Sequence, residues 1–474
     1  MTRTSFPRLA LAATMALALA ACGPGGQTTP GATEPGGTPA ETGTPAVTGS
    51  PAATGSPAVT GSPGVTGSPT TTGSPTAAEC PDTARDQRVE MWSPLTGPDG
   101  DEMTRLAQQY SEENQNGITV EHVPQPDYVT VLNTAAAGAQ LPAMTVVRVV
   151  NVAELVERGV LQPFPADLVS TFGFEGQFPD NVWGPGEYEG QRYSIPLDMH
   201  PLVMYYNRDL FQQAGVAEPG DQPWTVEEFE QALQALEGAG GARALSIGTH
   251  FQGGALFQTL IRQFGGALVS EDGTDVTYDE EPGVQALQRL NELQDQYSED
   301  ITGTGDPEVQ EFQQGRAAIV MHGPWWITGL QELEFTGFAP VPQMGGTEYA
   351  VWGGSHQLAL TSTDPAVQAA AGCWIAWLTE NSVQWGAAGQ VPARNSARED
   401  PQLETIAPAI GAIAESGPNV IILPQVAGIE HALWGEGFGP VVDAVLTGQE
   451  TDIQGALQRA AEHSQQLIDE NAGR

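Results

Sequence analysis

The chain has 474 residues and a formal net charge of −41, and its basic side chains are all arginine. Such a negative charge argues against nucleic acid and anionic membrane surfaces as partners, because both would repel it. The length is comfortable for two domains and long for a single core.

The first residues predict a secretory leader. An apolar run, Leu9 to Ala20, follows two arginines and is too short to span a bilayer. Leu19-Ala20-Ala21-Cys22 then resembles the bacterial lipobox, which predicts a signal peptide over 1–21 and a lipid on Cys22. The alternative is an ordinary secretory signal with a chance cysteine. No later run reaches spanning length, so we expect a chain held by its lipid alone on the extracytoplasmic face of the cell membrane.

Residues 22–80 predict a disordered tether. The tract consists almost entirely of Gly, Pro, Thr, Ser and Ala, and TGSP recurs with a period of six between residues 48 and 75. A chain with so few apolar groups cannot offset the entropy lost on ordering. We therefore expect globular structure to begin after Cys80.

The first part of the globular region alternates between strand and helix patterns. Strands are expected at "RVEMWSPL", "GITVEHV" and "MTVVRVV", and helices at "DEMTRLAQQYSEENQ", "DYVTVLNTAAAG" and "NVAELVERG". In the first helix, Met103, Leu106, Ala107 and Tyr110 share one face. This alternation is typical of a doubly wound α/β domain.

The rest of the chain is predicted to be rich in helices. In the segment 224–239, Thr225 and Glu228 form the pattern of a capping box. Asp364-Pro365 is a typical helix opening, a cap followed by proline. We expect further helices at 282–297, 306–314, 364–379 and 440–470, and a hairpin turn at Asp272-Gly273.

Cys80 and Cys373 are the only cysteines besides Cys22. Two thiols in an oxidising compartment can pair. Cys373 also falls at an apolar helical position, where it would serve as a small buried hydrophobe. The sequence leaves both readings open.

The sequence lacks the common catalytic motifs but has five clusters of aromatic and polar residues. There is no GxSxG, HExxH, phosphate loop or paired CxxC, and the histidines do not have metal-ligand spacing. The clusters lie at 195–211, 312–326, 350–360, 389–397 and 431–439. Tryptophan and tyrosine stack on the apolar faces of sugars, and histidine, acid and arginine groups bond their hydroxyls. We therefore expect a carbohydrate-binding protein with no catalytic residues, metal or cofactor.

At these clusters the sequence resembles the maltose-binding-protein-like family of extracellular solute-binding proteins. The pattern F-x-x-G-x-A-A-x-x-M-x-G-x-W, from Phe312 to Trp325, is the most specific. The resemblance covers nearly all of 86–474 and implies two α/β lobes joined by a hinge, with the ligand in the cleft between them. Lobe 1 would comprise 86–198 and 340–388, and lobe 2 would comprise 199–339 and 389–474.

The resemblance also implies a set of ligand-binding residues. His200 matches a family position that bonds sugar, and Trp325 and Trp434 match stacking tryptophans. The other positions expected to face the ligand are Trp92, Ser93, Asp198, Phe251, Gln252, Ser355, His356 and Arg394. One departure is Pro142-Ala143, where the family usually has Pro-Asp, so the following residues Arg148 and Asn151 align poorly.

In this family the expected partners are a carbohydrate and the permease subunits of an ABC importer with a cytoplasmic ATPase. The chain itself would be a monomer and would contact the membrane only through its lipid anchor. Two alternatives stay open, a binder of a non-sugar solute such as a glycerol-phosphate ester and a surface-anchored glycoside hydrolase. The first needs clustered cations, and the second needs two carboxylates flanking one bond.

Overall fold

The structure, a computed structural model, describes residues 80–303 and 305–472. The predicted signal peptide, Cys22 and the tract up to residue 79 lie outside this range. Within it, no helix combines the length and the hydropathy needed to cross a membrane.

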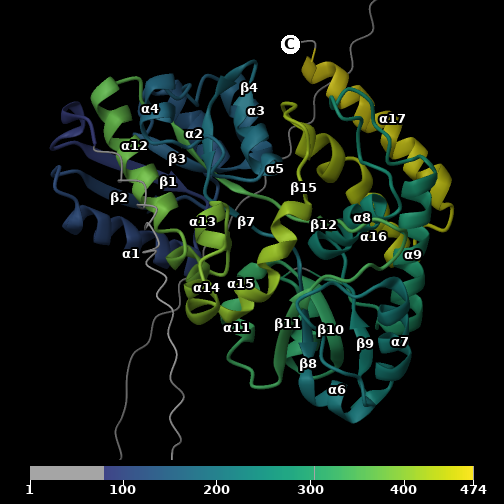
Figure 1. Ribbon diagram of the computed structural model, residues 1–474. Helices are drawn as coiled ribbons and strands as arrows, with labels where there is room; N and C mark the ends of the chain where they lie inside the picture. Colours follow the sequence, from purple (N-terminus) through teal and green to yellow (C-terminus); the bar gives the residue numbers. More distant parts are fainter. Residues whose placement is uncertain (1–79, 304, 473–474) are drawn as a thin grey trace, which may run out of the picture. The chain divides into compact units, whose positions relative to one another are not determined.

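The first sheet has the strand order β2-β1-β3-β13-β6. Its strands are β1 (Arg88–Ser93), β2 (Thr119–Pro124), β3 (Met144–Arg148), β6 (Ser194–Pro196) and β13 (His356–Leu360). The first three are parallel and are joined through α1 (Pro98–Glu113) and α2 (Tyr128–Ala137), as the alternating pattern predicts. β13 comes much later in the sequence and pairs antiparallel with β3 and β6. Figure 1 labels β1, β2 and β3 of this sheet, with α12 (Pro365–Glu380) beside them.

The second sheet has the order β11-β8-β10-β9. Its strands are β8 (Val203–Asn207), β9 (Arg243–Ser246), β10 (Ala317–His322) and β11 (Thr336–Pro340). The helices that follow its strands are α6 (Arg208–Ala214), α7 (Val226–Leu236), α8 (Phe251–Gln263), α9 (Glu281–Tyr297), α10 (Pro307–Gln313) and α11 (Ile327–Leu330). The capping box of Thr225 and Glu228 at α7 is confirmed.

Short elements complete the description. In the N-terminal half these are η1 (Asp82–Ala84), η2 (Val149–Asn151), α3 (Val152–Glu157), α4 (Ala166–Thr171), α5 (Asp180–Trp183), η3 (Gly184–Gly186), β4 (Glu187–Tyr188), β5 (Gln191–Arg192) and η4 (Ala239–Gly241). In the C-terminal half they are η5 (Pro324–Trp326), η6 (Gln384–Ala388), α13 (Asn395–Arg398), α14 (Gln402–Ile406), α15 (Pro408–Ile413), η7 (Ala414–Asn419) and η8 (His431–Gly435). The predicted turn at Asp272-Gly273 is confirmed, since Val269 and Val276 bridge antiparallel across it.

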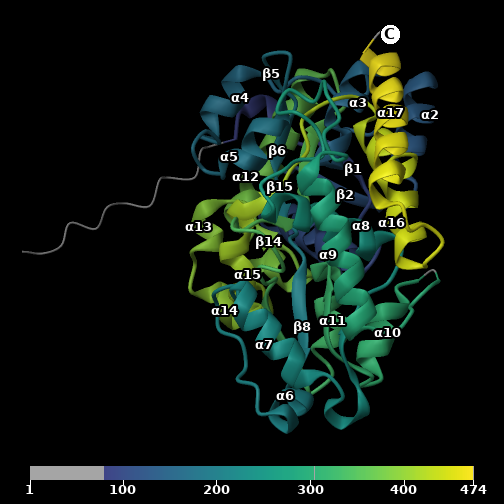
Figure 2. The ribbon, with the colours of Figure 1, turned by 90° about the vertical axis from the view of Figure 1, so that its right-hand side faces the viewer.

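The single helix predicted over 440–470 is wrong. Two helices occupy this segment, α16 (Phe438–Leu446) and α17 (Ile453–Ala472). Gly448 has φ = 66°, a left-handed conformation that ends a helix, and the Asp452 carboxylate accepts a hydrogen bond from Gly455 N at 3.1 Å. The two helices pack against each other (Figure 2).

Paired short strands lie where the chain passes between the two sheets. β7 (Asp198–Met199) pairs antiparallel with β14 (Val391–Pro392), and β12 (Val351–Trp352) pairs parallel with β15 (Val420–Ile421). β7 and β12 each connect a strand of one sheet to a strand of the other. These ladders bring together residues far apart in sequence, and the candidate site is built around them.

The hydrophobic core consists of clusters that each draw on distant parts of the chain. One cluster joins the first sheet and α12 (Pro365–Glu380) to one face of the second sheet, including Tyr205 and Val320. The same cluster includes Leu403 and Ile410 of α14 and α15. A second cluster fills the other face of the second sheet, beneath α8, α9, α16 and α17.

Helix α12 anchors the beginning of the described chain. The Asp364 carboxylate caps it by accepting from Ala366 N at 2.8 Å, and Ala371, Trp374 and Leu378 are fully buried on its inner face. Cys373, on the same helix, forms a disulfide with Cys80, with their Cα atoms 5.7 Å apart and 293 positions between them in sequence. Of the two readings that the sequence left open, the structure therefore selects the disulfide.

Candidate functional site

Four aromatic side chains gather at one place. Trp325 comes from η5, Trp352 from β12, Trp434 from η8 and Phe251 from the start of α8. The Phe251 ring lies 5.3 Å from Trp325, 4.9 Å from Trp352 and 5.8 Å from Trp434, and it is stacked on the last. Trp325 is 36% exposed, unusually high for so large a ring. These four side chains are called the aromatic wall below.

Two local features allow the aromatic wall to form. A Cβ on Gly254 of α8 would lie 2.8 Å from the Trp434 ring, so only glycine lets this ring approach the helix. Trp434 itself sits in η8, a single π-helical turn, which is a rare conformation that often marks functional sites.

The aromatic wall lines a hollow of about 580 Å³, a size typical of small-molecule sites. Five residues predicted from the sequence line it: His200, Phe251, Trp325, His356 and Trp434. The sequence analysis did not place the other seven there: Asp99, Arg148, Trp352, Gln390, Glu430, His431 and Gly435.

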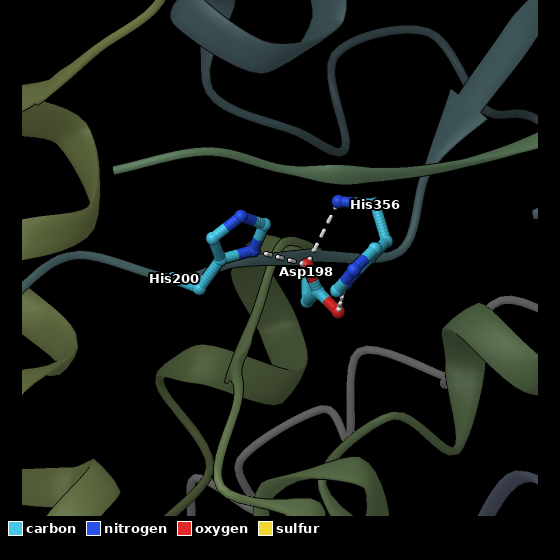
Figure 3. A group of neighbouring side chains, drawn as sticks. All are labelled: Asp198, His200 and His356. Atoms are coloured by element: carbon cyan, nitrogen blue, oxygen red, sulfur yellow. Dashed lines mark hydrogen bonds and ion pairs between the residues drawn. The ribbon is translucent and has the colours of Figure 1, made fainter. Parts of the chain in front are cut away.

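At the edge of the hollow, Asp198 joins two histidines (Figure 3). Its Oδ1 lies 3.3 Å from His200 Nδ1, and its Oδ2 lies 2.8 Å from His356 Nδ1. His356 N donates to Oδ1 at 2.9 Å and Trp385 Nε1 donates to Oδ2 at 2.8 Å. The carboxylate therefore has four N–H partners although it is fully buried.

This arrangement gives the two histidines different protonation. Burial alone would raise the pKa of Asp198, but the charge of His356 and hydrogen bonds from both histidines hold it below its usual value. Burial would lower the pKa of His356, but the charge of Asp198 and its hydrogen bond raise it. The pKa of His200 is lowered, chiefly by burial. His356 thus presents an Nε2–H donor, and neutral His200, with its proton on Nδ1, presents Nε2 as an acceptor.

The Asp198–His356 pair should stabilise the fold most between about pH 4 and about pH 6.5. The pKa of Asp198 is lowered, so its contribution to the free energy of unfolding is lost as the pH falls below that window. The pKa of His356 is raised, so its contribution is lost as the pH rises above the window. We expect His356→Gln to lower the free energy of unfolding more at about pH 6 than at about pH 9 in urea titrations. His463→Gln, at an exposed pair with Glu436, is the control. Equal losses at both pH values would contradict the assignment.

Among residues 80–303 and 305–472, two groups of side chains have the spacing of metal ligands, but hydrogen bonds already occupy the atoms that would bind an ion. Asp198, His200 and His356 are close enough to hold an ion, yet both carboxylate oxygens accept N–H groups. In the other group, His322 lies beside Asp306 and Glu308. Its Nδ1 accepts from Gly323 N at 2.9 Å, so its Nε2 carries the proton and cannot bind a metal. This second group instead supports η5, since Asp306 also accepts from Trp326 Nε1 at 3.2 Å.

An ion pair crosses the hollow between distant parts of the chain. Arg148, at the end of β3, contacts Glu430, just before η8, through two hydrogen bonds of 2.7 and 2.8 Å. Both side chains remain partly exposed, at 45% and 34%. A bidentate pair of this kind fixes orientation as well as distance.

The structure does not bring several predicted site residues to the hollow. Trp92 and Ser93 lie within β1 and do not follow it, and Ser93 Oγ bonds His122 Nε2 at 2.6 Å. Gln252 is fully buried and bonds the backbone of Ser246 and Met321.

The remaining predicted residues have structural partners. Arg394 is buried and points to Thr379 and Glu380. Ser355 is fully buried and accepts a hydrogen bond from Gln357 Nε2 at 3.0 Å. Asp198 is also fully buried, and it orients the two histidines without facing the hollow. None of these three side chains lines the hollow, and their partners inside the protein are not readable from the sequence pattern.

Comparison with known proteins places the chain in a family. A family model described as "Bacterial extracellular solute-binding protein" matches residues 105–409. The chain is 25% identical over 354 residues to the maltotriose-binding protein of Pyrococcus abyssi, covering 71% of this chain and 73% of that protein. It is 24% identical over 259 residues to the maltodextrin-binding protein MdxE of Bacillus subtilis, covering 51% of this chain and 58% of that protein.

Solved structures show the same fold. The sugar-binding protein MalE from Xanthomonas citri matches with a TM-score of 0.70 and 20% identity, covering 81% of this chain and 98% of that one. The cyclic alpha-maltosyl-1,6-maltose binding protein from Arthrobacter globiformis matches with a TM-score of 0.67 and 21% identity, covering 81% and 99%. The resemblance to the maltose-binding-protein-like family is confirmed, and the fold is the two-lobed α/β fold that it implied. The chain belongs to the bacterial extracellular solute-binding proteins, which bind their solute and are not enzymes.

Proposed function

We propose that the chain captures a sugar or oligosaccharide as the substrate-binding subunit of an ABC importer and delivers it to the permease. One observation carries the proposal: the aromatic wall and the histidine pair face the same hollow. Indole rings match the apolar faces of a sugar ring, while His200 Nε2 accepts from a hydroxyl and His356 Nε2–H donates to one. The names of the maltotriose- and maltodextrin-binding relatives support the same class of ligand.

Further polar groups suit a ligand with many hydroxyls. Asp99 lines the hollow at the start of α1, and its Oδ1 accepts from Gly97 N and Gly100 N, which leaves its other oxygen for a ligand. Gln390 Oε1 is buried, lines the hollow and has no hydrogen-bond partner among the described residues. A buried acceptor without a partner is costly, so a ligand hydroxyl would satisfy it.

The alternative of a phosphate ester is less well supported. Arg148 is the only arginine in the lining, and its guanidinium is engaged by Glu430. A phosphate needs cationic or N–H donors that are free to bind it. The hollow's carboxylates, Asp99 and Glu430, would repel it further.

We also propose that capture involves closure of two lobes about β7, β12 and β14, with lobe 1 at 86–198 and 340–388 and lobe 2 at 199–339 and 389–474. The Arg148–Glu430 pair joins a strand end of the first lobe to the segment before η8 in the second. Closure stabilises a liganded state only when the ligand binds that state more tightly.

Thermal-shift screening against mono- and oligosaccharides, followed by calorimetric titration of each hit, tests the proposed function. We expect at least one sugar to raise the melting temperature in a concentration-dependent way, because a ligand that binds only the folded state stabilises it. Glycerol 3-phosphate is included in the panel. Stabilisation by the phosphate ester and by no sugar would favour the alternative.

Trp325→Ala tests the stacking role of the aromatic wall. Loss of a central aromatic anchor is expected to cost about 2 kcal/mol or more of binding free energy, roughly a thirtyfold weakening of the affinity for the sugar identified above. Ligand-free melting should change little because the ring is partly exposed. Trp374→Ala is the contrasting variant. Trp374 lies on α12 and is fully buried, so its loss should lower the free energy of unfolding by about 3–5 kcal/mol. Normal binding by Trp325→Ala would contradict the role.

We further propose that Cys22 carries a lipid and holds the protein on the extracytoplasmic face of the membrane. We expect Cys22→Ala to move from the membrane fraction to the soluble fraction on immunoblots, since the described residues contain no spanning helix. Intact-mass analysis checks the modification directly. An unmodified N-terminus at another residue would contradict anchoring.

A further inference from the structure

A second, smaller cavity adjoins the hollow on the far side of Trp352 and Trp434. It measures about 90 Å³, and it shares Arg148, His200, Glu430 and the two tryptophans with the hollow. We call this cavity the apolar recess. The shared residues show that the two spaces lie side by side.

The lining of the recess differs from that of the hollow. Val150 and the consecutive residues Ile421, Ile422 and Leu423 line it and are each only half-buried. Three successive aliphatic side chains left partly exposed inside a cleft form an apolar surface that calls for a partner.

Arg148, Glu430 and Ser355 in the lining of the recess are bonded within the protein, which leaves Gln258 and His200 as its other polar side chains apart from the tryptophans. Arg148 bonds Glu430 in bidentate fashion, and Ser355 bonds the backbone of His356 and the side chain of Gln357. A second sugar ring placed here would lose water from its hydroxyls and find few partners. Each hydroxyl left unpaired weakens binding by about fivefold or more. An apolar group carries no such penalty and gains from burial.

We propose that the ligand is a glycoside with a small apolar aglycone, whose sugar lies against the aromatic wall and whose aglycone enters the apolar recess. The inference rests on the proposed function and adds the class of ligand to it. An engineered cavity of about 150 Å³ binds benzene, so a recess of about 90 Å³ beside the hollow suits a substituent no larger than a single ring.

Three matched ligands test the inference by calorimetric titration: methyl α-maltoside, phenyl α-maltoside and maltotriose. We expect phenyl maltoside to bind at least about tenfold more tightly than methyl maltoside, because the ring buries apolar surface. Maltotriose, which places a hydroxylated ring where the phenyl group would lie, should bind no more tightly than methyl maltoside. Tightest binding by maltotriose would overturn the inference and leave the proposed sugar capture intact.

Val150→Phe tests whether the tighter binding of phenyl maltoside depends on the recess, because the larger side chain fills the recess. In this variant the ratio of phenyl to methyl maltoside affinity should fall to about one, as expected when the space for the ring is lost. The control is Ile406→Phe, at an aliphatic side chain that is 40% exposed and is not part of either lining. An unchanged ratio in Val150→Phe would overturn the inference. If Val150→Phe does not fold, Leu423→Asn takes its place.

A probe without sugar separates failure of this inference from failure of the proposed function. If no maltoside binds, the maltodextrin-like sugar specificity fails, and 4-fluorophenol followed by fluorine NMR still tests the recess. We expect its resonance to broaden with the wild-type protein and with Ile406→Phe, and to stay sharp with Val150→Phe. Equal broadening with all three proteins would show that the probe binds elsewhere, which contradicts the inference.

Discussion

Asp198→Ala is expected to lower the free energy of unfolding by about 3–5 kcal/mol, the usual cost of removing one partner from a buried charged pair. Asp198 is fully buried and accepts from two imidazoles, one backbone N–H and one indole N–H. The substitution leaves the raised-pKa His356 without its counter-charge and Trp385 without an acceptor. Urea titrations of the ligand-free proteins measure the loss.

Asp99→Ala is the matched control for this experiment. Asp99 lines the hollow beside which Asp198 is buried, but it is only half-buried and its bonds are to the backbone at the start of α1. Loss of such a helix-terminal acceptor costs about 1 kcal/mol. Similar losses for the two variants would show that the carboxylate of Asp198 is no more important to the fold than a terminal cap.

Removal of the Cys80–Cys373 disulfide is the second large effect. A cross-link over 293 positions restricts the unfolded chain strongly, and the chain-entropy relation gives about 6 kcal/mol for a loop of this length. We expect the double variant Cys80→Ala/Cys373→Ala to lose stability on that order in urea titrations.

Reduction provides the control for the disulfide. Dithiothreitol should destabilise the wild-type protein and leave the double variant unchanged. Peptide mapping without reductant should find the peptides that contain Cys80 and Cys373 joined to each other. Two free thiols at these positions in the oxidised protein would contradict the cross-link.

The sequence predicts local elements well where the pattern is regular. The order β1-α1-β2-α2-β3 follows from alternating strand and helix patterns, and α7 and α12 are marked by their caps. The pairing of β13 with β3 is beyond such patterns, because it joins segments about two hundred residues apart. The division between α16 and α17 was readable from Gly448 and Asp452, whose turn and capping signals outweigh the apolar periodicity of the segment.

The candidate site shows a different limit. The family resemblance implied Trp325, Trp434 and His200, which lie beside glycine or proline, and all three line the hollow. The same cluster that holds His356 contains Trp352, beside two glycines, and this signal was missed. The pattern of residue types in the sequence does not predict which polar side chains form hydrogen bonds inside the protein. Ser93 and Gln252 are occupied in that way, so their chemistry is not free for a ligand.

The cross-link between Cys80 and α12 also decides how the protein bears force. Tension applied to the chain ahead of Cys80 enters the described structure at that residue and passes through the disulfide into α12, whose inner face is buried in the core. β1 begins only at Arg88, beyond the cross-link, so its hydrogen bonds to β2 and β3 carry none of that load. Reduction would transfer the pull to β1, the second strand of the first sheet, which lies between β2 and β3.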